Sequence, residues 1–301
     1  MRVVTFTPIK QYAMNIIQVY KQFPIHLDCI KHLENVRWNN EPVCPYCGSK
    51  RQSPQPKEQR YKCNNCNMSY SVTVGTIFHK TKLDLQKWFL AITLVLNAKK
   101  GLSARQLARD IEVTKDTAWY MLMRIRKAFI DDNELMEGIV EVDETYVGGK
   151  NKNRHNDKKT KGGQGRGGDD KTAVVGTLQR DGKVRAQKVK DVSAKTLHGI
   201  VKKNIKKGTQ LMTDEWRSYN GLSLLYGHNI VRHAMGEYVN GACHTNTLEG
   251  FWSLLKRGVI GQFHYVSPKY LNKYMDEFCY RYNNRNNTEI FSQTLLKAVS
   301  L

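Results

Sequence analysis

The chain has 301 residues and a formal net charge of +21, with 48 lysines and arginines against 27 aspartates and glutamates. This length allows two or three domains with a sizeable core, and this charge indicates a polyanion partner, either nucleic acid or an anionic membrane. No apolar run approaches the roughly 18 residues of a membrane span, and the N-terminus lacks the apolar core of a signal peptide. We therefore expect no membrane association and a cytoplasmic protein that binds nucleic acid.

Scattered apolar positions in residues 1–40 predict a lead-in of short helices. A regular cysteine pattern follows, C-x2-C-x15-C-x2-C, formed by Cys44, Cys47, Cys63 and Cys66. Four thiolates satisfy tetrahedral Zn²⁺ and leave no open position for catalysis, so the pattern predicts a structural zinc ribbon over residues 41–80. Ribbons of this kind bind nucleic acid or protein, and the spacing does not separate these two possibilities.

Residues 81–132 have the pattern of a helix-turn-helix domain. The apolar period predicts a helix over 83–98, Ser103 is placed to cap a short helix ending near Asp110, and Thr114 to cap a longer one reaching Phe129. The last helix carries four basic residues that we expect to contact DNA: Lys115, Arg124, Arg126 and Lys127. An ordinary three-helix packing unit with a basic face is the alternative.

Residues 133–301 predict an α/β domain. Residues 139–149, IVEVDETYVGG, have the composition of a strand that carries Asp143, with Glu141 on the same face. A basic stretch rich in glycine, residues 150–171, predicts a flexible loop. Two further strands over 172–178 and 184–189, a helix after Ser193 and a strand over 210–214 complete the pattern, and the last strand ends in Asp214.

Residues 244–257, HTNTLEGFWSLLKR, predict a helix with one apolar stripe. Glu249 lies at the edge of this stripe, Lys256 lies two turns further along the same line, and Asn246 is near the same face. A helix beginning at Pro268 follows. Acids from a strand, a strand end and a helix, Asp143, Asp214 and Glu249, could converge on a pair of Mg²⁺ or Mn²⁺ ions for phosphoryl transfer.

Three segments, EVDETYVGGK, LMTDEWRSYNGL and the long run that starts at HTNTLEGFWSLLKRGVIGQFHYV, resemble bacterial insertion-sequence transposases of the ISXO-like group. The N-terminal zinc ribbon is also similar to that of the group. The resemblance implies a ribonuclease H-like fold, a DDE-type active site, and metal-dependent cutting and joining of double-stranded DNA. It further implies that Asp143 and Asp214 bind Mg²⁺ or Mn²⁺, that Glu249 is the third acid, and that Lys256 holds a phosphate near the element end.

Several alternatives remain open at this point. Members of the group vary between glutamate and asparagine at the third position, which leaves Asn246 as the alternative to Glu249. The chain could be a DNA-binding regulator with a catalytically silent core, or a ribonuclease or resolvase with a similar core. Pairing two element ends needs at least a dimer, so we expect a homo-oligomer.

Overall fold

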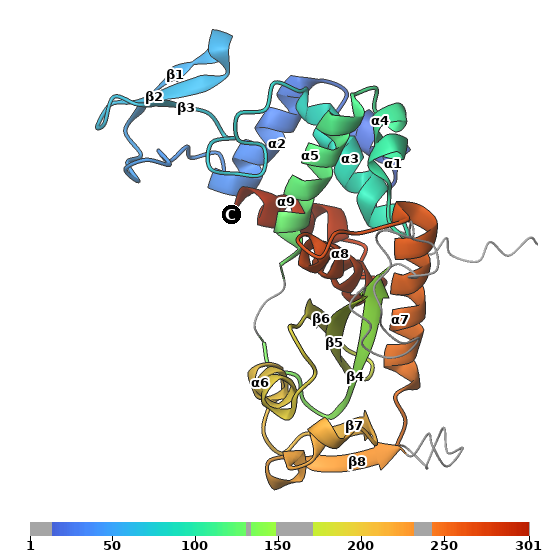
Figure 1. Ribbon diagram of the computed structural model, residues 1–301. Coiled ribbons are helices and arrows are strands. Elements are labelled where there is room, and N and C mark those ends of the chain that lie inside the picture. The colour runs from blue at the N-terminus through green and yellow to red at the C-terminus, as the bar shows by residue number, and fades with distance from the viewer. Residues whose placement is uncertain (1–13, 131–133, 149–170, 232–242, 301) are drawn as a thin grey trace, which may run out of the picture. The chain divides into compact units, whose positions relative to one another are not determined.

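The computed structural model describes residues 14–130, 134–148, 171–231 and 243–300. The chain forms two units, one made of Met1–Phe129 with Asn284–Leu301 and one made of Ile130–Asn283. Figure 1 labels the elements of both. The first unit is a helical body with a small three-stranded sheet, and the second is built on a five-stranded mixed sheet. The α/β class predicted from the sequence is therefore confirmed for the second unit.

Short capped helices make up the body of the first unit. They are α1 (Ile16–Gln22), α2 (His26–Trp38), α3 (Leu85–Asn97), α4 (Ala104–Asp110), α5 (Lys115–Ile125) and α9 (Ile290–Val299). Asp84, Ser103 and Thr114 each accept a hydrogen bond from a backbone N–H in the first turn of the helix that follows. These bonds satisfy donors that a helix start leaves unpaired, which explains why α3, α4 and α5 begin where they do.

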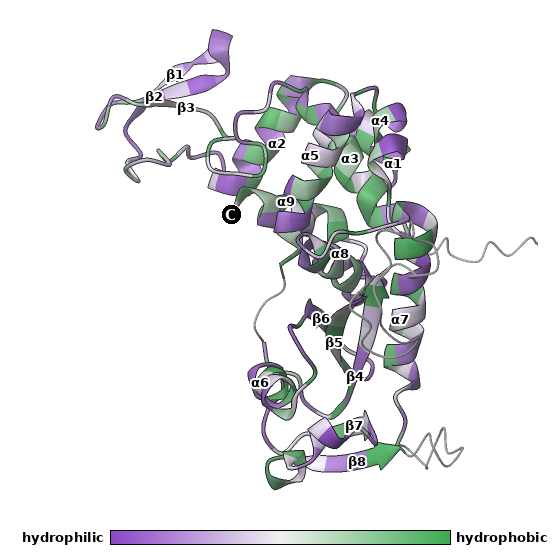
Figure 2. Ribbon diagram, in the orientation of Figure 1, coloured by the Kyte–Doolittle hydropathy of each residue, from purple (hydrophilic) through white to green (hydrophobic). Residues whose placement is uncertain are grey.

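The small sheet of the first unit consists of β1 (Gln52–Gln55), β2 (Arg60–Cys63) and β3 (Ser69–Tyr70), paired antiparallel in that order. A short 3₁₀ helix, Pro56–Glu58, joins β1 to β2. Figure 2 shows β1 and β2 coloured mostly as hydrophilic. A sheet this small and polar buries little apolar surface, so something other than a hydrophobic core must stabilise it.

The C-terminal helix α9 belongs to the first unit, which corrects the predicted domain boundary. Residues 133–301 were expected to form one catalytic domain, but residues 284–300 pack with the helices of the first unit. Phe291 of α9 lies 5.8 Å from Phe89 of α3 and 6.4 Å from Phe23, between ring centroids, and the Ile77 N–H donates to the Ala298 carbonyl. The apolar face of α9 is thus buried by residues from the start of the chain, a contact that local sequence cannot reveal.

The sheet of the second unit has the order β6-β5-β4-β7-β8. Its strands are β4 (Ile139–Gly148), β5 (Lys171–Gln179), β6 (Val184–Lys188), β7 (Gln210–Asp214) and β8 (Gly227–Val231). The first three form an antiparallel meander, whereas β7 pairs parallel with β4 and β8 pairs parallel with β7. This central antiparallel meander extended by parallel strands is the ribonuclease H-like arrangement that the family resemblance implies.

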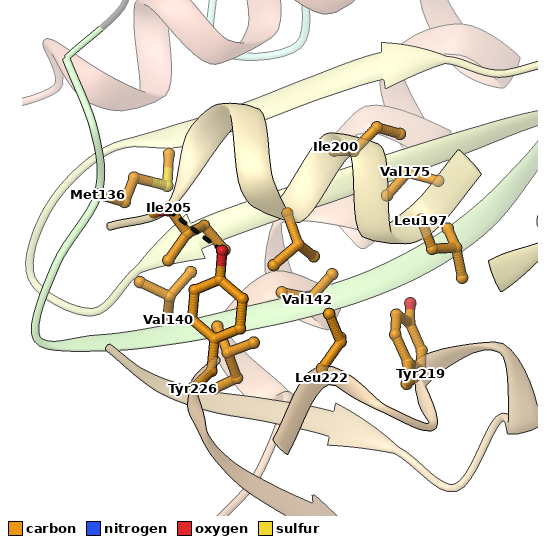
Figure 3. Close-up of a cluster of buried hydrophobic side chains, with 12 residues drawn as sticks. Met136, Val140, Val142, Val175, Leu197, Ile200, Ile205, Tyr219, Leu222 and Tyr226 are labelled. Carbon is orange, nitrogen blue, oxygen red and sulfur yellow. Dashed lines mark hydrogen bonds between the residues drawn. The ribbon is translucent and has the colours of Figure 1, made fainter. Parts of the chain in front are cut away.

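The two faces of this sheet are covered by different helices. The helix α6 (Ala194–Asn204) packs on the face formed by Val140, Val142 and Val175, together with Tyr219 and Tyr226, as Figure 3 shows. The opposite face receives α7 (Asn246–Gly258), which continues into a π-helical turn, Val259–Phe263. The helix α8 (Leu271–Asn283) lies along the edge strand β6, where an Asn283 side chain bonds both backbone groups of Val184.

Most elements predicted for the second unit are confirmed within a residue or two, including the strand that ends at Asp214. The expected loop 150–171 lies outside the described residues, except that Lys171 already begins β5. The helix capped by Thr114 ends at Ile125 and not at Phe129, since residues 126–129 tighten into a 3₁₀ turn. Among the described residues, no helix is long and apolar enough to span a membrane.

Candidate functional site

The four predicted cysteines come together in the ribbon. The sulfur atoms of Cys44, Cys47, Cys63 and Cys66 all lie within 4.8 Å of one another. The Cys44–Cys66 and Cys47–Cys63 sulfur distances are 3.7 and 3.6 Å. Four thiolates at the usual Zn–S distance of about 2.3 Å around a tetrahedral ion would be about 3.8 Å apart. The cluster therefore has the dimensions of a zinc site with four cysteine ligands.

Each pair of cysteines sits in a tight turn that points both sulfurs inward. In the first turn the Gly48 N–H donates to the Cys44 carbonyl, and Gly48 has the positive φ of 73° that glycine adopts most easily. In the second, the backbone N–H of Asn65 donates to the Cys63 sulfur over 3.4 Å. Such N–H donors stabilise thiolates, so these turns suit a metal site better than a pair of disulfides.

The carboxylates of the second unit gather at the carboxyl end of the parallel strands. The strand β4 pairs with β7 from Ile139–Gln210 to Glu141–Met212, at a constant offset of 71 residues. The same offset separates Asp143 from Asp214, so the two aspartates follow the last paired residues on neighbouring strands. In open sheets with parallel strands, ligands bind at this end, where the strands part and side chains from both can meet.

A third acid joins them, and it is Glu144. One carboxylate oxygen from each of Asp143, Glu144 and Asp214 lies within 4.8 Å of the others. Asp143 and Glu144 point to opposite faces of β4, as adjacent strand residues do, and Asp214 meets them from the end of β7. Three carboxylates this close repel one another, and hard divalent cations such as Mg²⁺ and Mn²⁺ prefer such oxygen ligands. The residues present therefore fit a divalent cation.

The surroundings of Asp143 raise its pKa, and hydrogen bonds hold the other two acids in place. Burial, with the charges of Glu144 and Asp214, raises the pKa of Asp143 to about 7, although a hydrogen bond from Trp252 opposes the shift. The Tyr219 hydroxyl donates to Glu144 over 2.8 Å. Burial and the nearby carboxylates hold the pKa of Tyr219 well above its ordinary value, so this phenol remains a hydrogen-bond donor. The Trp216 backbone N–H donates to Asp214.

Glu249 and Lys256 belong to α7, the helix that packs on the face of β4 carrying Asp143. Glu249 is exposed, and its carboxylate accepts a hydrogen bond from Thr245. It is not part of the three-acid cluster formed within the described residues. Asn246 and Lys256 are also exposed on this helix. The structure thus brings together Asp143 and Asp214, adds Glu144, and leaves the predicted roles of Glu249, Asn246 and Lys256 as predictions.

One of the four residues predicted to contact DNA, Arg126, is buried inside the first unit, which corrects its assignment. A second, Arg124, is half-buried and hydrogen-bonded within the same unit, so its contact with DNA stays a prediction. Arg126 has only 1% of its surface exposed and cannot reach a phosphate. Arg124 donates from one nitrogen to the carbonyls of Ile77 and His79, at 2.8 and 2.6 Å. Its guanidinium also lies 4.8 Å from the centre of the Tyr120 ring. The basic pattern alone could not distinguish these structural arginines from the exposed Lys115 and Lys127.

Sequence reasoning also missed residues that support the site. Period-two alternation places Glu144 on the face of β4 opposite Asp143, so the sequence did not predict that Glu144 meets Asp214 at the end of β7. Trp252 was counted as part of the apolar stripe of its helix, yet its indole N–H donates to Asp143 over 2.9 Å. Tyr219 lies in a segment with no strong pattern. The sequence did contain one signal for Glu144: it is an acidic residue that directly follows Asp143, a predicted metal ligand.

Comparison with known proteins finds relatives for both units of the chain. Residues 135–283 match the family model for the ISXO2-like transposase domain, and residues 27–69 match the transposase zinc-ribbon domain. A relative from Halobacterium salinarum, "Uncharacterized protein in transposable element ISH50", is 30% identical over 237 residues, which are 75% of this chain and 80% of that protein.

Among solved structures, the Mos1 strand transfer complex covers 70% of this chain and 75% of its own, at 12% identity and a TM-score of 0.27. A pre-cleavage Mos1 transpososome gives 68% and 76%, at 14% identity and a TM-score of 0.24. TM-scores this low do not establish a shared fold. The two domain matches and the similarity to the halobacterial protein do establish the family: the chain belongs to the ISXO2-like transposases.

Proposed function

We propose that this protein is a DNA transposase that binds the ends of its element, cuts the DNA there and joins the freed end to target DNA. The observation that supports this function best is the meeting of Asp143, Glu144 and Asp214 within 4.8 Å at the end of a ribonuclease H-like sheet. A cluster of this kind in a chain with a net charge of +21 has the DNA backbone as its natural substrate.

In this proposal Asp143 and Asp214 hold Mg²⁺ or Mn²⁺, with Glu144 beside them and Glu249 of α7 as the third acid. Such ions, when bound, activate an attacking oxygen and stabilise the leaving one. Water first attacks the phosphodiester at the element end and displaces a 3′-hydroxyl. That hydroxyl then attacks a phosphodiester of the target strand in the same site, forms the new P–O bond and displaces a target 3′-hydroxyl. In the same proposal Lys256, which is exposed on α7, holds a phosphate near that end.

End recognition is assigned to α4 and α5, which we propose act as a helix-turn-helix. The turn between them is short, from Ile111 to Thr114, and α5 presents an exposed Lys115. Two large aromatic side chains are also exposed on α5, with Trp119 39% and Tyr120 46% accessible. Exposed aromatic and basic groups on one helix suit contact with base edges and phosphates. The ribbon adds a second DNA or protein contact, and pairing of two ends calls for at least a dimer.

The proposal is tested with the purified full-length chain and labelled DNA carrying one element end. We expect Mg²⁺-dependent nicking at the element boundary, loss of nicking in Asp143→Asn and Asp214→Asn, and unchanged end binding in both variants. End binding without any metal-dependent nicking by the wild-type chain would instead favour a DNA-binding regulator. Preference for an RNA–DNA hybrid over DNA ends would favour a ribonuclease.

The same assay identifies the third acid. We expect Glu249→Gln to abolish strand transfer, whereas normal strand transfer in this variant would exclude Glu249 and leave Asn246 and Glu144 as candidates for the third position. Glu144→Gln is the matched comparison, because its carboxylate lies in the cluster and Glu249 does not. Loss of Mn²⁺ binding in Glu144→Gln with little effect in Glu249→Gln would make Glu144 the ligand.

A further inference from the structure

The indole of Trp252 makes a polar contact that its burial alone does not require. Trp252 is 4% exposed and sits on the apolar stripe of α7, but its Nε1–H donates to the Oδ2 atom of Asp143 over 2.9 Å. An indole nitrogen is only a donor, so the direction of this bond is certain. A carboxylate with one oxygen held in this way cannot turn about its Cβ–Cγ bond without breaking the contact.

A glycine on the neighbouring strand makes room for this indole. Gly176 is the cross-strand partner of Asp143, so both residues face α7. A Cβ atom at Gly176 would lie 2.6 Å from Cζ2 and 2.7 Å from Cη2 of Trp252. Any side chain at this position would push the indole away from the sheet and lift its N–H from Asp143. The glycine and the tryptophan are therefore parts of one arrangement.

The geometry of strand and helix fixes this contact in register. The Leu248 N–H of α7 donates to Glu141, and four residues later the Trp252 indole donates to Asp143. Four helical residues rise about 6 Å, and two strand residues span about 6.7 Å. One turn of α7 therefore matches two residues of β4. Both carboxylates of this strand face are thus held by the helix that carries Glu249.

We propose that Trp252 is a positioning residue of the metal site, which orients the Asp143 carboxylate for a divalent cation through its indole N–H, with Gly176 providing the space. This inference rests on the proposed function only in taking Asp143 as a metal ligand. Groups that orient a ligand in this way commonly change metal affinity by about 10- to 100-fold when they are removed.

The test measures Mn²⁺ binding to the full-length chain by electron paramagnetic resonance of the free ion, without DNA. We expect Trp252→Phe, which keeps an aromatic ring but has no N–H, to weaken Mn²⁺ binding by about tenfold or more. Trp88→Phe is the matched control: Trp88 is also buried, and its indole N–H donates to the Thr81 hydroxyl over 2.9 Å in the first unit. Its Mn²⁺ affinity should stay within about twofold of the wild type.

A second replacement separates the hydrogen bond from packing. Incorporation of β-(3-benzothienyl)alanine at position 252 keeps both fused rings and replaces the N–H by sulfur, so the fold is retained even if Trp252→Phe is unstable. It should weaken Mn²⁺ binding as strongly as Trp252→Phe. Mn²⁺ affinity equal to that of the wild type in this folded variant would overturn the inference. An Asp143→Asn variant that binds Mn²⁺ as tightly as the wild type would also overturn it.

Failure of the proposed function gives a different result. A chain that binds Mn²⁺ through Asp143 and weakens with the loss of the indole N–H, yet cuts no DNA, would support the positioning role and contradict the transposase. A chain that cuts DNA and keeps full Mn²⁺ affinity without the indole N–H would support the transposase and contradict the positioning role of Trp252. If the chain cuts DNA, removing the indole N–H should raise the Mn²⁺ concentration needed for cutting and leave the affinity for the DNA end nearly unchanged. A loss of structure would lower the affinity for the DNA end as well.

Discussion

At the scale of single residues, the protonation of Asp143 controls the proposed metal site. Its pKa of about 7 is raised mainly by burial and further by the charges of Glu144 and Asp214. Below about pH 7 the neutral carboxyl of Asp143 is therefore the favoured form in the folded chain without metal. The neutral Asp143 carboxyl contributes its full stabilisation of the fold below the ordinary aspartate pKa near 4. This stabilisation is lost as the pH rises through about 7.

Metal binding should show the opposite pH dependence, because a cation needs the charged carboxylate. We expect Mn²⁺ affinity to rise about tenfold per pH unit up to about pH 7 and then level off. The increase in melting temperature caused by Mn²⁺ should accordingly be larger at pH 8 than at pH 6. Differential scanning fluorimetry measures this increase at both pH values. An equal increase at pH 6 and pH 8 would contradict the raised pKa of Asp143. Asp143→Asn should remove the dependence.

At the scale of elements, the start of α7 is anchored on a buried ion pair. Glu141 is fully buried and accepts hydrogen bonds from the Arg180 side chain, the Thr247 hydroxyl and the Leu248 N–H. Its negative charge thus lies at the positive end of the α7 dipole. Notably, this carboxylate shares a face of β4 with Asp143 but supports the helix and is not part of the three-acid cluster.

Removing the charge of Glu141 should therefore destabilise the second unit. We expect Glu141→Gln to lower the free energy of unfolding by on the order of 3 kcal/mol, because Arg180 would be left without its buried partner. Glu137→Gln is the control, since its ion pair with Lys206 is exposed and worth less than about 1 kcal/mol. Urea unfolding followed by circular dichroism measures both, and equal effects would argue against the anchor.

Two basic residues of α5, Arg124 and Lys115, should respond differently to substitution, because one stabilises the fold and the other contacts DNA. Arg124→Ala leaves two carbonyls without their donor, so it should lower stability by on the order of 2 kcal/mol. Lys115→Ala should leave stability unchanged, weaken end binding, and reduce the salt dependence of binding by about one phosphate contact. Titrations at several salt concentrations check this. A Lys115→Ala chain that binds DNA like the wild type would remove Lys115 from the interface, and unchanged binding in Arg124→Ala as well would remove α5.

The sequence predicted elements better than contacts. Apolar period, helix caps and turn residues placed α3 to α7 and most strands, because these signals are local. The spacing of Asp143 and Asp214 turned out to be a strand register, which no local pattern states. The burial of Arg126, the approach of Glu144 and the return of α9 to the first unit all depend on residues distant in the chain. These were therefore beyond reach of pattern alone.

At the scale of the whole molecule, the ribbon should depend on zinc for its fold. Its core beyond the cysteines is small, with Trp38, Tyr61, Tyr70 and Val74 packed against Cys44 and Cys63. We expect about one zinc per chain, and its removal by a strong chelator should unfold the ribbon while leaving most of the helical signal. Zinc release followed colorimetrically tests this. Cys44→Ser should lose the ion, whereas Cys243→Ser, outside the cluster, should retain it.

The central claim is that carboxylates in the middle of β4 and at the end of β7 hold the metal that cuts DNA. Its most direct test is the metal preference of Asp143→Cys and Asp214→Cys in the DNA nicking assay. A thiolate is a softer ligand than a carboxylate and favours Mn²⁺ over Mg²⁺. Both variants should be inactive with Mg²⁺ and regain nicking with Mn²⁺, while the wild type uses either ion. Nicking by the two variants with Mg²⁺ at the wild-type rate would contradict the account.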